Sequence, residues 1–225
     1  MRKSLEDIPN NTVEAQQVIA ERRSRQLGLP VIILARPGTY GSSGDHGQRR
    51  QIREFLALNA ALDEIKKKYE IERFVLSGHS GGATAVGALL TLGREDIACA
   101  IMTSGAFGLL ERAQRRRERR GDPPAPDTDG TGLRNPYDPL DHVAGVVKDP
   151  ERKILIIGNR KDVNTPFDLQ IQFKKALSNL GHQVRLMDYS AKEPDYHNLV
   201  DGIGYSAIQY CALSKEHASP SGEKR

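Results

Sequence analysis

Blocks of apolar and polar positions follow one another along the chain, and their spacing predicts strands and helices in alternation. Short continuous apolar runs are typical of strands buried on both faces, and they occupy 31–35, 73–77, 97–103, 153–158 and 184–189. Apolar positions with helical spacing fill the segments between them: Thr12 to Gly28, 48–69, the run after Ser80, 165–180 and 199–213. This alternation predicts an α/β fold, a three-layer αβα sandwich around a mostly parallel sheet.

The pattern also divides the chain. Residues 1–12 and 214–225 are polar and are predicted to be tails, so the expected domain spans 13–213. Residues 106–150 break the rhythm and are predicted to form a cap-like surface insertion. That insertion holds a basic run, Arg112 to Arg120. Two interpretations of the run stay open: a solvated helix face, or a cap surface that meets acidic substrates.

Composition narrows the class of protein. The chain has 225 residues, of which 38% are hydrophobic and 28% charged, as expected for one globular domain. No apolar run approaches the length of a membrane span, and the first residues do not resemble a secretory leader. The net charge of +4 is modest and gathers largely in the basic run. We therefore expect a cytoplasmic protein with neither a nucleic-acid nor a membrane partner.

Two cysteines, Cys99 and Cys211, lie in apolar segments far apart in the sequence. Their placement predicts two buried free thiols in a reducing compartment. No cluster of histidines, cysteines and acidic residues has the spacing of a metal site, so no metal is expected.

The most informative stretch is Gly78-His79-Ser80-Gly81-Gly82, which fits the pattern G-x-S-x-G between an apolar run and a helical run. Glycine two residues before and after the serine allows a sharp turn where a side chain would collide with the backbone. The turn would present Ser80 at a helix N-terminus, where free N–H groups favour developing negative charge. Ser80 is therefore the candidate nucleophile.

Two further groups follow predicted strands, at the carboxyl edge of the sheet where ligands bind. Asp162 follows 153–158, and His197 follows 184–189. A serine needs a base to take its proton, and a carboxylate on the other ring nitrogen orients that base. The chain order Ser80, Asp162, His197 thus predicts a triad. Rival candidates with weaker placement are Asp138, Asp141 and His46.

With these motifs in place, the chain resembles the α/β-hydrolase superfamily over roughly residues 13–213. The elbow at Ser80, the acid loop ending Asp162-Val163-Asn164-Thr165-Pro166 and the late His197 carry the resemblance. The last third is most similar to the prolyl-oligopeptidase-like and dienelactone-hydrolase-like branches. The resemblance implies hydrolysis of an ester, thioester or amide through an acyl-enzyme, acting on a small-molecule or peptide acyl substrate without a cofactor.

The sequence departs from this family at the oxyanion hole, which requires two donors. The backbone N–H of Gly81 is the expected first donor. Only one predicted strand, 31–35, precedes the elbow, and the family's oxyanion strand has no counterpart. Either 31–35 pairs directly with 73–77, with Thr39 or Tyr40 as the second donor, or an N-terminal portion that carried the first strands is missing. We favour the missing portion.

Two functions follow from the sequence. The first is a serine esterase or peptidase that uses Ser80, Asp162 and His197. The alternative is a non-enzymatic binding or interaction protein on a hydrolase scaffold, inactive because it lacks a complete oxyanion hole.

Overall fold

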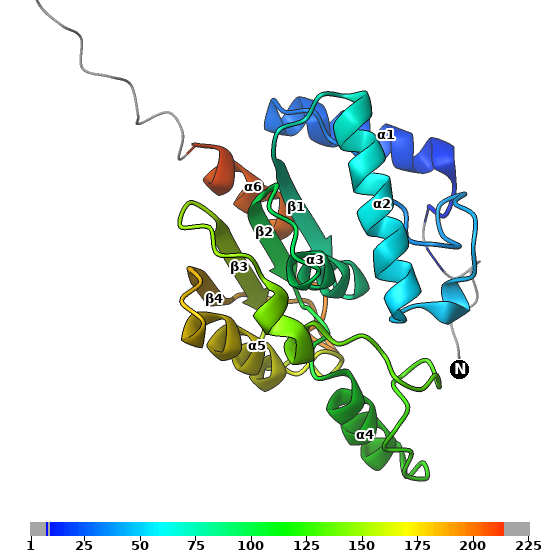
Figure 1. Cartoon of the computed structure of the whole chain (residues 1–225). Coiled ribbons are helices and arrows are strands. Elements are labelled where there is room, and N and C mark those ends of the chain that lie inside the picture. The colour runs from blue at the N-terminus through cyan, green and yellow to red at the C-terminus, as the bar shows by residue number, and fades with distance from the viewer. Residues whose placement is uncertain (1–7, 9, 214–225) are drawn as a thin grey trace, which may run out of the picture.

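A computed structural model describes residue 8 and residues 10–213 (Figure 1). Its centre is a parallel sheet in which each strand pairs with the next along the chain, in the order β1-β2-β3-β4. The strands are β1 (Phe74–His79), β2 (Ile97–Thr103), β3 (Lys153–Gly158) and β4 (Val184–Asp188). Parallel order places all four carboxyl ends at one edge, so the residues that follow β1, β3 and β4 meet there.

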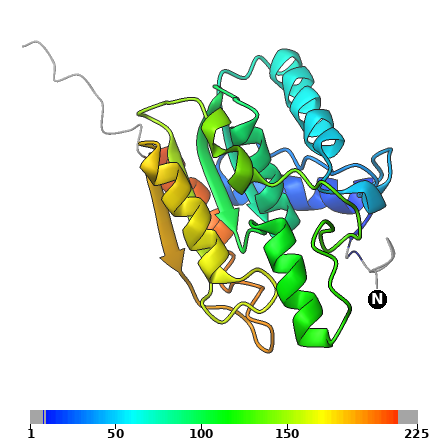
Figure 2. The same ribbon diagram turned by 60° about the horizontal axis from the view of Figure 1, so that its bottom comes forward.

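One face of the sheet carries the larger core. It is covered by α2 (Ile52–Lys68), α3 (Gly81–Thr91), α5 (Phe167–Asn179) and the 3₁₀ segment η3 (Pro139–Gly145). Helix α3 consists mainly of small and aliphatic residues, and its residues from Ala83 to Thr91 are all buried. Small side chains let α3 lie close to β1 and β2, directly behind the serine turn. Figure 2 shows this helix between α2 and α5.

The opposite face is covered by α6 (Ile203–Leu213), with α1 (Val13–Leu27) beside it. The guanidinium of Arg23 on α1 lies 3.6 Å from the ring centre of Tyr205 on α6. Helices on both faces give the three-layer α/β architecture that the sequence predicts. In Figure 1, α2, α3 and α5 lie in front of the sheet and α6 lies behind it.

Helix α1 has the ends that the sequence predicts. The side chain of Thr12 accepts a hydrogen bond from the N–H of Ala15, and Gly28 ends the helix with φ of 66°. None of its residues is buried, and Val18 is 63% exposed. The helix is therefore held by its ends and by contacts such as Arg23 with Tyr205 rather than by a buried face.

The prediction of a strand at 31–35 is wrong. The segment is neither helix nor strand, and β1 forms the edge of the described sheet. A strand requires a partner for its backbone groups, and no described strand pairs with the outer side of β1. Leu34 still packs against the larger core, whereas Ile32 is 49% exposed. The segment crosses this side of the molecule and leads to a short 3₁₀ turn, η2 (His46–Gln48).

The prediction of free thiols is also wrong, because a disulfide joins Cys99 to Cys211. Cys99 lies on β2 and Cys211 on α6, and their Cα atoms are 6.1 Å apart. Helix α6 packs across β2, and this packing brings the two sulfurs together. The cysteines are 112 residues apart, so the sequence alone does not indicate that they are neighbours. Disulfides are typical of oxidising compartments, so the bond does not favour the predicted cytoplasmic location.

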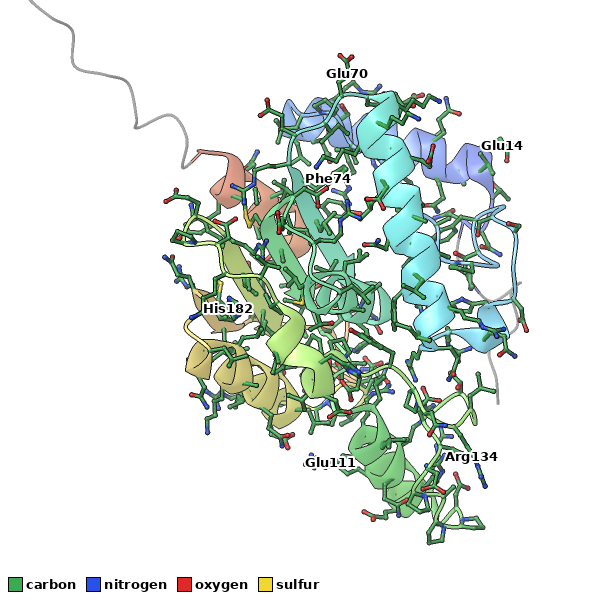
Figure 3. The ribbon with its side chains drawn as sticks, in the orientation of Figure 1. Glu14, Glu70, Phe74, Glu111, Arg134 and His182 are labelled. Atoms are coloured by element: carbon green, nitrogen blue, oxygen red, sulfur yellow. A yellow bond between two sulfur atoms is a disulfide. The ribbon has the colours of Figure 1, made fainter. Side chains whose placement is uncertain are left out.

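The stretch from 106 to 150 contains α4 (Leu109–Arg120), a long loop and η3. Segment η3 packs on α3 and α5, whereas α4 lies toward the edge that carries the serine turn (Figure 1). In Figure 3, Glu111 marks α4 and Arg134 marks the loop that follows it. The predicted tails fall largely on residues 1–7, 9 and 214–225, which lie outside the described residues.

Among residues 8 and 10–213, the helices are too short or too polar to cross a lipid bilayer.

The stacked pair Phe107 and Phe173 tests the larger core. Both rings are fully buried, and their centres lie 4.1 Å apart. Phe173→Ala should lower the free energy of unfolding by about 3–5 kcal/mol, because it removes a buried ring and leaves a cavity. Chemical denaturation measures this change. Leu56→Ala, at a site that is 50% exposed, is the control and should change it by less than about 0.5 kcal/mol. Equal effects of the two variants would contradict the assigned core.

Candidate active site

The serine turn has the geometry that presents a nucleophile. Ser80 lies between β1 and α3 with φ of 54° and ψ of −115°, a combination that costs energy for any residue other than glycine. Its N–H donates to the carbonyl of Thr103 at 2.9 Å, which ties the turn to the end of β2. A side chain at Gly78 would overlap the carbonyl of Gly82 and approach the nitrogen of Ala83 to 2.7 Å. Glycine at 78 is thus required for the close strand-to-helix approach.

The second glycine of the motif is not required in the same way. A Cβ at Gly82 would meet nothing within 4 Å, which differs from the collision expected from the sequence. A Cβ at Gly81 would instead overlap the Nη1 atom of Arg36. Of the three glycines, Gly78 alone is required by backbone packing. The guanidinium of Arg36 fills the space beside Gly81.

The carboxylate of Asp162 is held on both oxygens in the loop after β3. Oδ1 accepts from the N–H groups of Asn164 and Thr165, at 2.7 and 2.8 Å. Oδ2 accepts from the Thr165 hydroxyl at 2.6 Å and lies 2.9 Å from Nδ1 of His197. Burial alone would raise the pKa of Asp162, but the hydrogen bonds from His197 and Thr165 outweigh it and lower the pKa. The carboxylate therefore stays ionised at neutral pH.

The imidazole of His197 comes from the loop after β4 and is 7% exposed. Its Nδ1 faces the Asp162 carboxylate, which favours the tautomer with the proton on Nδ1 and leaves Nε2 as an acceptor. Its backbone carbonyl accepts from the hydroxyl of Ser104, just beyond β2. Within the described residues, no hydrogen bond joins the hydroxyl of Ser80 to His197. Such contacts are often long until substrate binds.

The three loops meet at one edge of the sheet. His79, directly before Ser80, has its ring centre 4.9 Å from that of His197. The Nδ1 atom of His79 lies 3.2 Å from the hydroxyl of Thr103. Desolvation and, after it, the nearby His197 lower the pKa of His79 to about 4, so it is neutral above that pH. The structure thus brings Asp162 and His197 together beside the turn that holds Ser80.

The rival candidates have other roles. Both oxygens of Asp138 accept backbone N–H groups, from Leu109 and Leu140, so this buried carboxylate fixes the start of α4 and η3. Asp141 is exposed on η3. Burial, and after it the charges of Arg36 and Arg49, lowers the pKa of His46, whose charged neighbours do not include Asp162 or His197.

The predicted second oxyanion donors are engaged elsewhere. The N–H of Thr39 donates to the carbonyl of Arg36 at 3.0 Å, within the turn that this loop forms. The N–H of Tyr40 donates to Asn11 Oδ1 at 2.6 Å. Neither backbone group is free for the site, because the first closes a turn of the loop and the second binds a side chain that precedes α1. Gly81, at the first turn of α3, keeps an N–H with no partner inside the helix.

Sequence reasoning missed two arginines at this edge. Arg36 directly follows the apolar run 31–35, a position that could have marked it. Arg112 is buried on α4, and its Nε and Nη2 donate to the carbonyl and side-chain oxygen of Asn164, both at 2.6 Å. Burial, followed by the charges of Arg50 and Arg116, lowers the pKa of Arg112 to about 9. The basic run is therefore partly an anchor that fixes the acid loop, not only a solvated face.

A cavity of about 230 Å³ opens beside the turn, on the side of the sheet that α6 covers. Its walls include Ser77, His79, Thr103, Asn198, Leu199 and Tyr205. A larger one, of about 470 Å³, lies near the opposite ends of the strands, between α2 and the start of β2. Only the smaller cavity adjoins the histidine loop.

A parallel sheet with a serine turn after one strand, an acid after a later one and a histidine after the last defines an α/β-hydrolase fold. Comparison with family models gives a match to the prolyl oligopeptidase family over residues 43–194, more than half of the chain. The chain belongs to this family. The matched region includes Ser80 and Asp162 and stops just before His197.

Solved structures share the fold at low sequence identity. An esterase from Pyrococcus furiosus superposes with a TM-score of 0.63 at 16% identity, covering 89% of this chain and 74% of that one. Est1E from Butyrivibrio proteoclasticus gives a TM-score of 0.62 at 15% identity, covering 92% of this chain and 86% of that one. An acylaminoacyl peptidase from Pyrococcus horikoshii gives 0.55 at 16% identity, covering 84% of this chain but 32% of its own. The chain thus spans about a third of that peptidase.

No curated protein sequence matches the chain significantly.

The two outer glycines of the motif provide a matched test of the turn. Gly78→Ala places a methyl group against the Gly82 carbonyl and should lower the free energy of unfolding by about 1–3 kcal/mol. Gly82→Ala meets open space and should leave it unchanged or slightly raise it. Thermal and chemical denaturation of both variants compares the two. Similar losses from the two substitutions would show that the turn is not built as described.

The environment of His79 predicts a pH dependence of stability. Its pKa is about 4 in the folded chain against 6.5 for the free side chain, so the unfolded chain binds the extra proton between these values. The free energy of unfolding should therefore fall as the pH drops from 6.5 to 4, by a small amount because the His79 side chain is exposed and solvent screens the shift. His79→Asn should reduce this slope, measured by denaturant titration at several pH values. An unchanged slope would rule out His79 as a contributor.

Proposed function

We propose that this protein is a serine hydrolase that cleaves an ester or amide bond through an acyl-enzyme. Ser80 is the nucleophile, His197 the general base and Asp162 the residue that orients it. The observation that carries the proposal is the 2.9 Å contact between His197 Nδ1 and Asp162 Oδ2, buried at the edge where the strained Ser80 turn emerges. A turn that only connects a strand to a helix would require neither the positive φ of Ser80 nor a buried histidine–carboxylate pair beside it.

The chemistry follows from these positions. The Ser80 hydroxyl adds to the substrate carbonyl carbon while its proton passes to Nε2 of His197. The ionised Asp162 stabilises the imidazolium, and the N–H of Gly81 donates to the oxyanion. Collapse of the tetrahedral intermediate releases an alcohol or amine, which takes the proton from His197. Water then repeats the sequence on the acyl-enzyme, releases the acid and regenerates Ser80, with no cofactor required.

The substrate class is a small-molecule or peptide acyl compound. The relatives of similar fold are named as esterases and acylaminoacyl peptidases, and the Est1E structure holds ferulic acid. A cavity of about 230 Å³ beside the elbow favours a small acyl or alcohol group. We therefore propose an ester as the first substrate to try, with a short peptide as the variant.

One observation supports the alternative of a binding protein on a hydrolase scaffold. The backbone N–H groups of Thr39 and Tyr40 already donate to the Arg36 carbonyl and the Asn11 side chain, and no described strand lies beside the outer edge of β1. A site with Gly81 as its sole donor would stabilise the oxyanion poorly.

Reaction with a fluorophosphonate distinguishes the two functions. The wild-type protein should form one adduct, and Ser80→Ala should form none. Asp162→Asn should slow labelling on the order of 10⁴-fold, because the histidine loses its orientation and favoured tautomer. Ser24→Ala, which removes a hydroxyl on α1 that donates to the carbonyl of Leu29, is the control and should label normally. Absence of labelling in a folded wild-type sample would support the binding protein and contradict the hydrolase.

A further inference from the structure

The guanidinium of Arg36 lies directly against Gly81, the first residue of α3 and the expected oxyanion donor. An ideal Cβ at Gly81 would overlap Nη1 of Arg36, and it would lie 3.2 Å from Cζ and 3.7 Å from Nη2. The guanidinium therefore covers the side of Gly81 on which a side chain would stand. Arg36 belongs to the segment that precedes the elbow, on the side where β1 has no partner strand in the described residues.

The inner end of the Arg36 side chain is fixed. Its Nε donates to Oε1 of Glu54, a carboxylate whose side chain is 3% exposed. The second oxygen of Glu54 accepts from the N–H of Arg50, so the carboxylate is itself held in place. The carbonyl of Arg36 accepts from Thr39 and Ser42, which also fixes the backbone. Glu54 thus aims the guanidinium at Gly81 with few alternative orientations.

The outer end of the same group has no partner. Nη2 is buried and makes no hydrogen bond to any described residue, and none is made by Nη1. A buried donor of a charged group without an acceptor is costly, so such donors are usually satisfied. Glu54 uses one nitrogen of Arg36, and the other two have no acceptor among the described residues. Nη1, which is not among the fully buried atoms, would be satisfied by an acceptor that arrives with the substrate.

We propose that the guanidinium of Arg36 is the second oxyanion donor of this site. The proposal rests on the hydrolase function proposed above. Arg36 places Nη1 against Gly81, and the positive guanidinium complements the negative charge that develops on the carbonyl oxygen. It takes the role that Thr39 and Tyr40 cannot take, since their N–H groups are bound to the Arg36 carbonyl and the Asn11 side chain.

Two other roles for Arg36 make different predictions. If it only pairs with Glu54 to hold the loop, its loss lowers stability and leaves kcat unchanged in the folded protein. If it binds an anionic group of the substrate, its loss raises KM for acidic esters and spares neutral ones. If Arg36 is an oxyanion donor, its loss lowers kcat for neutral and acidic esters alike, because it acts on the carbonyl group that every ester shares.

The first experiment measures kcat and KM of the full chain with a neutral and an acidic nitrophenyl ester. Arg36→Met should lower kcat about 10²–10³-fold on both esters with little change in KM. Arg36→Lys should recover part of this loss, since it restores a cation without the fork that Glu54 holds. Arg53→Met is the matched control, an exposed arginine on α2 next to Glu54, and should behave as the wild type. Circular dichroism confirms that each variant is folded.

A second variant displaces the guanidinium without altering it. Gly81→Ala keeps the backbone N–H at position 81 but puts a methyl group where Nη1 lies, so the flexible end of Arg36 must move. It should lower kcat in the same way as Arg36→Met. The double variant should lose little more than either single one, because both changes remove the same interaction. Fully multiplicative losses would contradict the proposal.

The outcomes separate this proposal from the function on which it rests. Turnover that Ser80→Ala abolishes and Arg36→Met preserves would establish the hydrolase and overturn the role of Arg36. A KM effect confined to the acidic ester, or a loss of stability with normal kcat, would overturn it equally. Absence of Ser80-dependent turnover in the wild type would overturn both.

Discussion

The close approach of β1 and α3 at Gly78 is the constraint on which the site depends. The backbone of Gly82 and Ala83 occupies the space that a Cβ at position 78 would need. Because residue 78 is glycine, the chain can reverse direction within a few residues. Ser80 then adopts a positive φ and is held by the carbonyl of Thr103 at the end of the neighbouring strand. The favourable packing of the parallel sheet and of α3 offsets the strain at Ser80. The small residues of α3 allow this helix to lie close to β1 and β2.

The remaining parts of the site depend on this arrangement through the sheet. Parallel pairing aligns the ends of β3 and β4 with the end of β1, and this places Asp162 and His197 at the same edge. Arg112, from the basic helix α4, then holds the acid loop through Asn164. The basic run thus helps to position the Asp162 carboxylate, which is proposed to orient the general base.

Much of this follows from the sequence because it depends on local pattern and chain order. The strands at 97–103 and 153–158 are found where the apolar runs predict them, and Thr12 and Gly28 bound α1. The sequence identifies Ser80, Asp162 and His197 as candidate site residues because each follows a predicted strand. The failures involve partners that a linear pattern does not reveal. Residues 31–35 have no neighbouring strand in the described part of the chain, and Cys99 meets Cys211 only because α6 crosses β2. The N–H of Thr39 is bound within its own turn, and that of Tyr40 is bound to Asn11, 29 residues earlier in the chain.

The central claim is that Ser80 forms a covalent acyl intermediate, and trapping that intermediate tests it most directly. The wild-type protein is mixed with nitrophenyl acetate, quenched in acid within the first turnover, and measured by intact mass and peptide mapping. The account predicts one added acetyl group, located on the peptide that contains Ser80 and absent from Ser80→Ala. Release of nitrophenol at the wild-type rate by Ser80→Ala, or an acetyl group found on another residue during turnover, would contradict it.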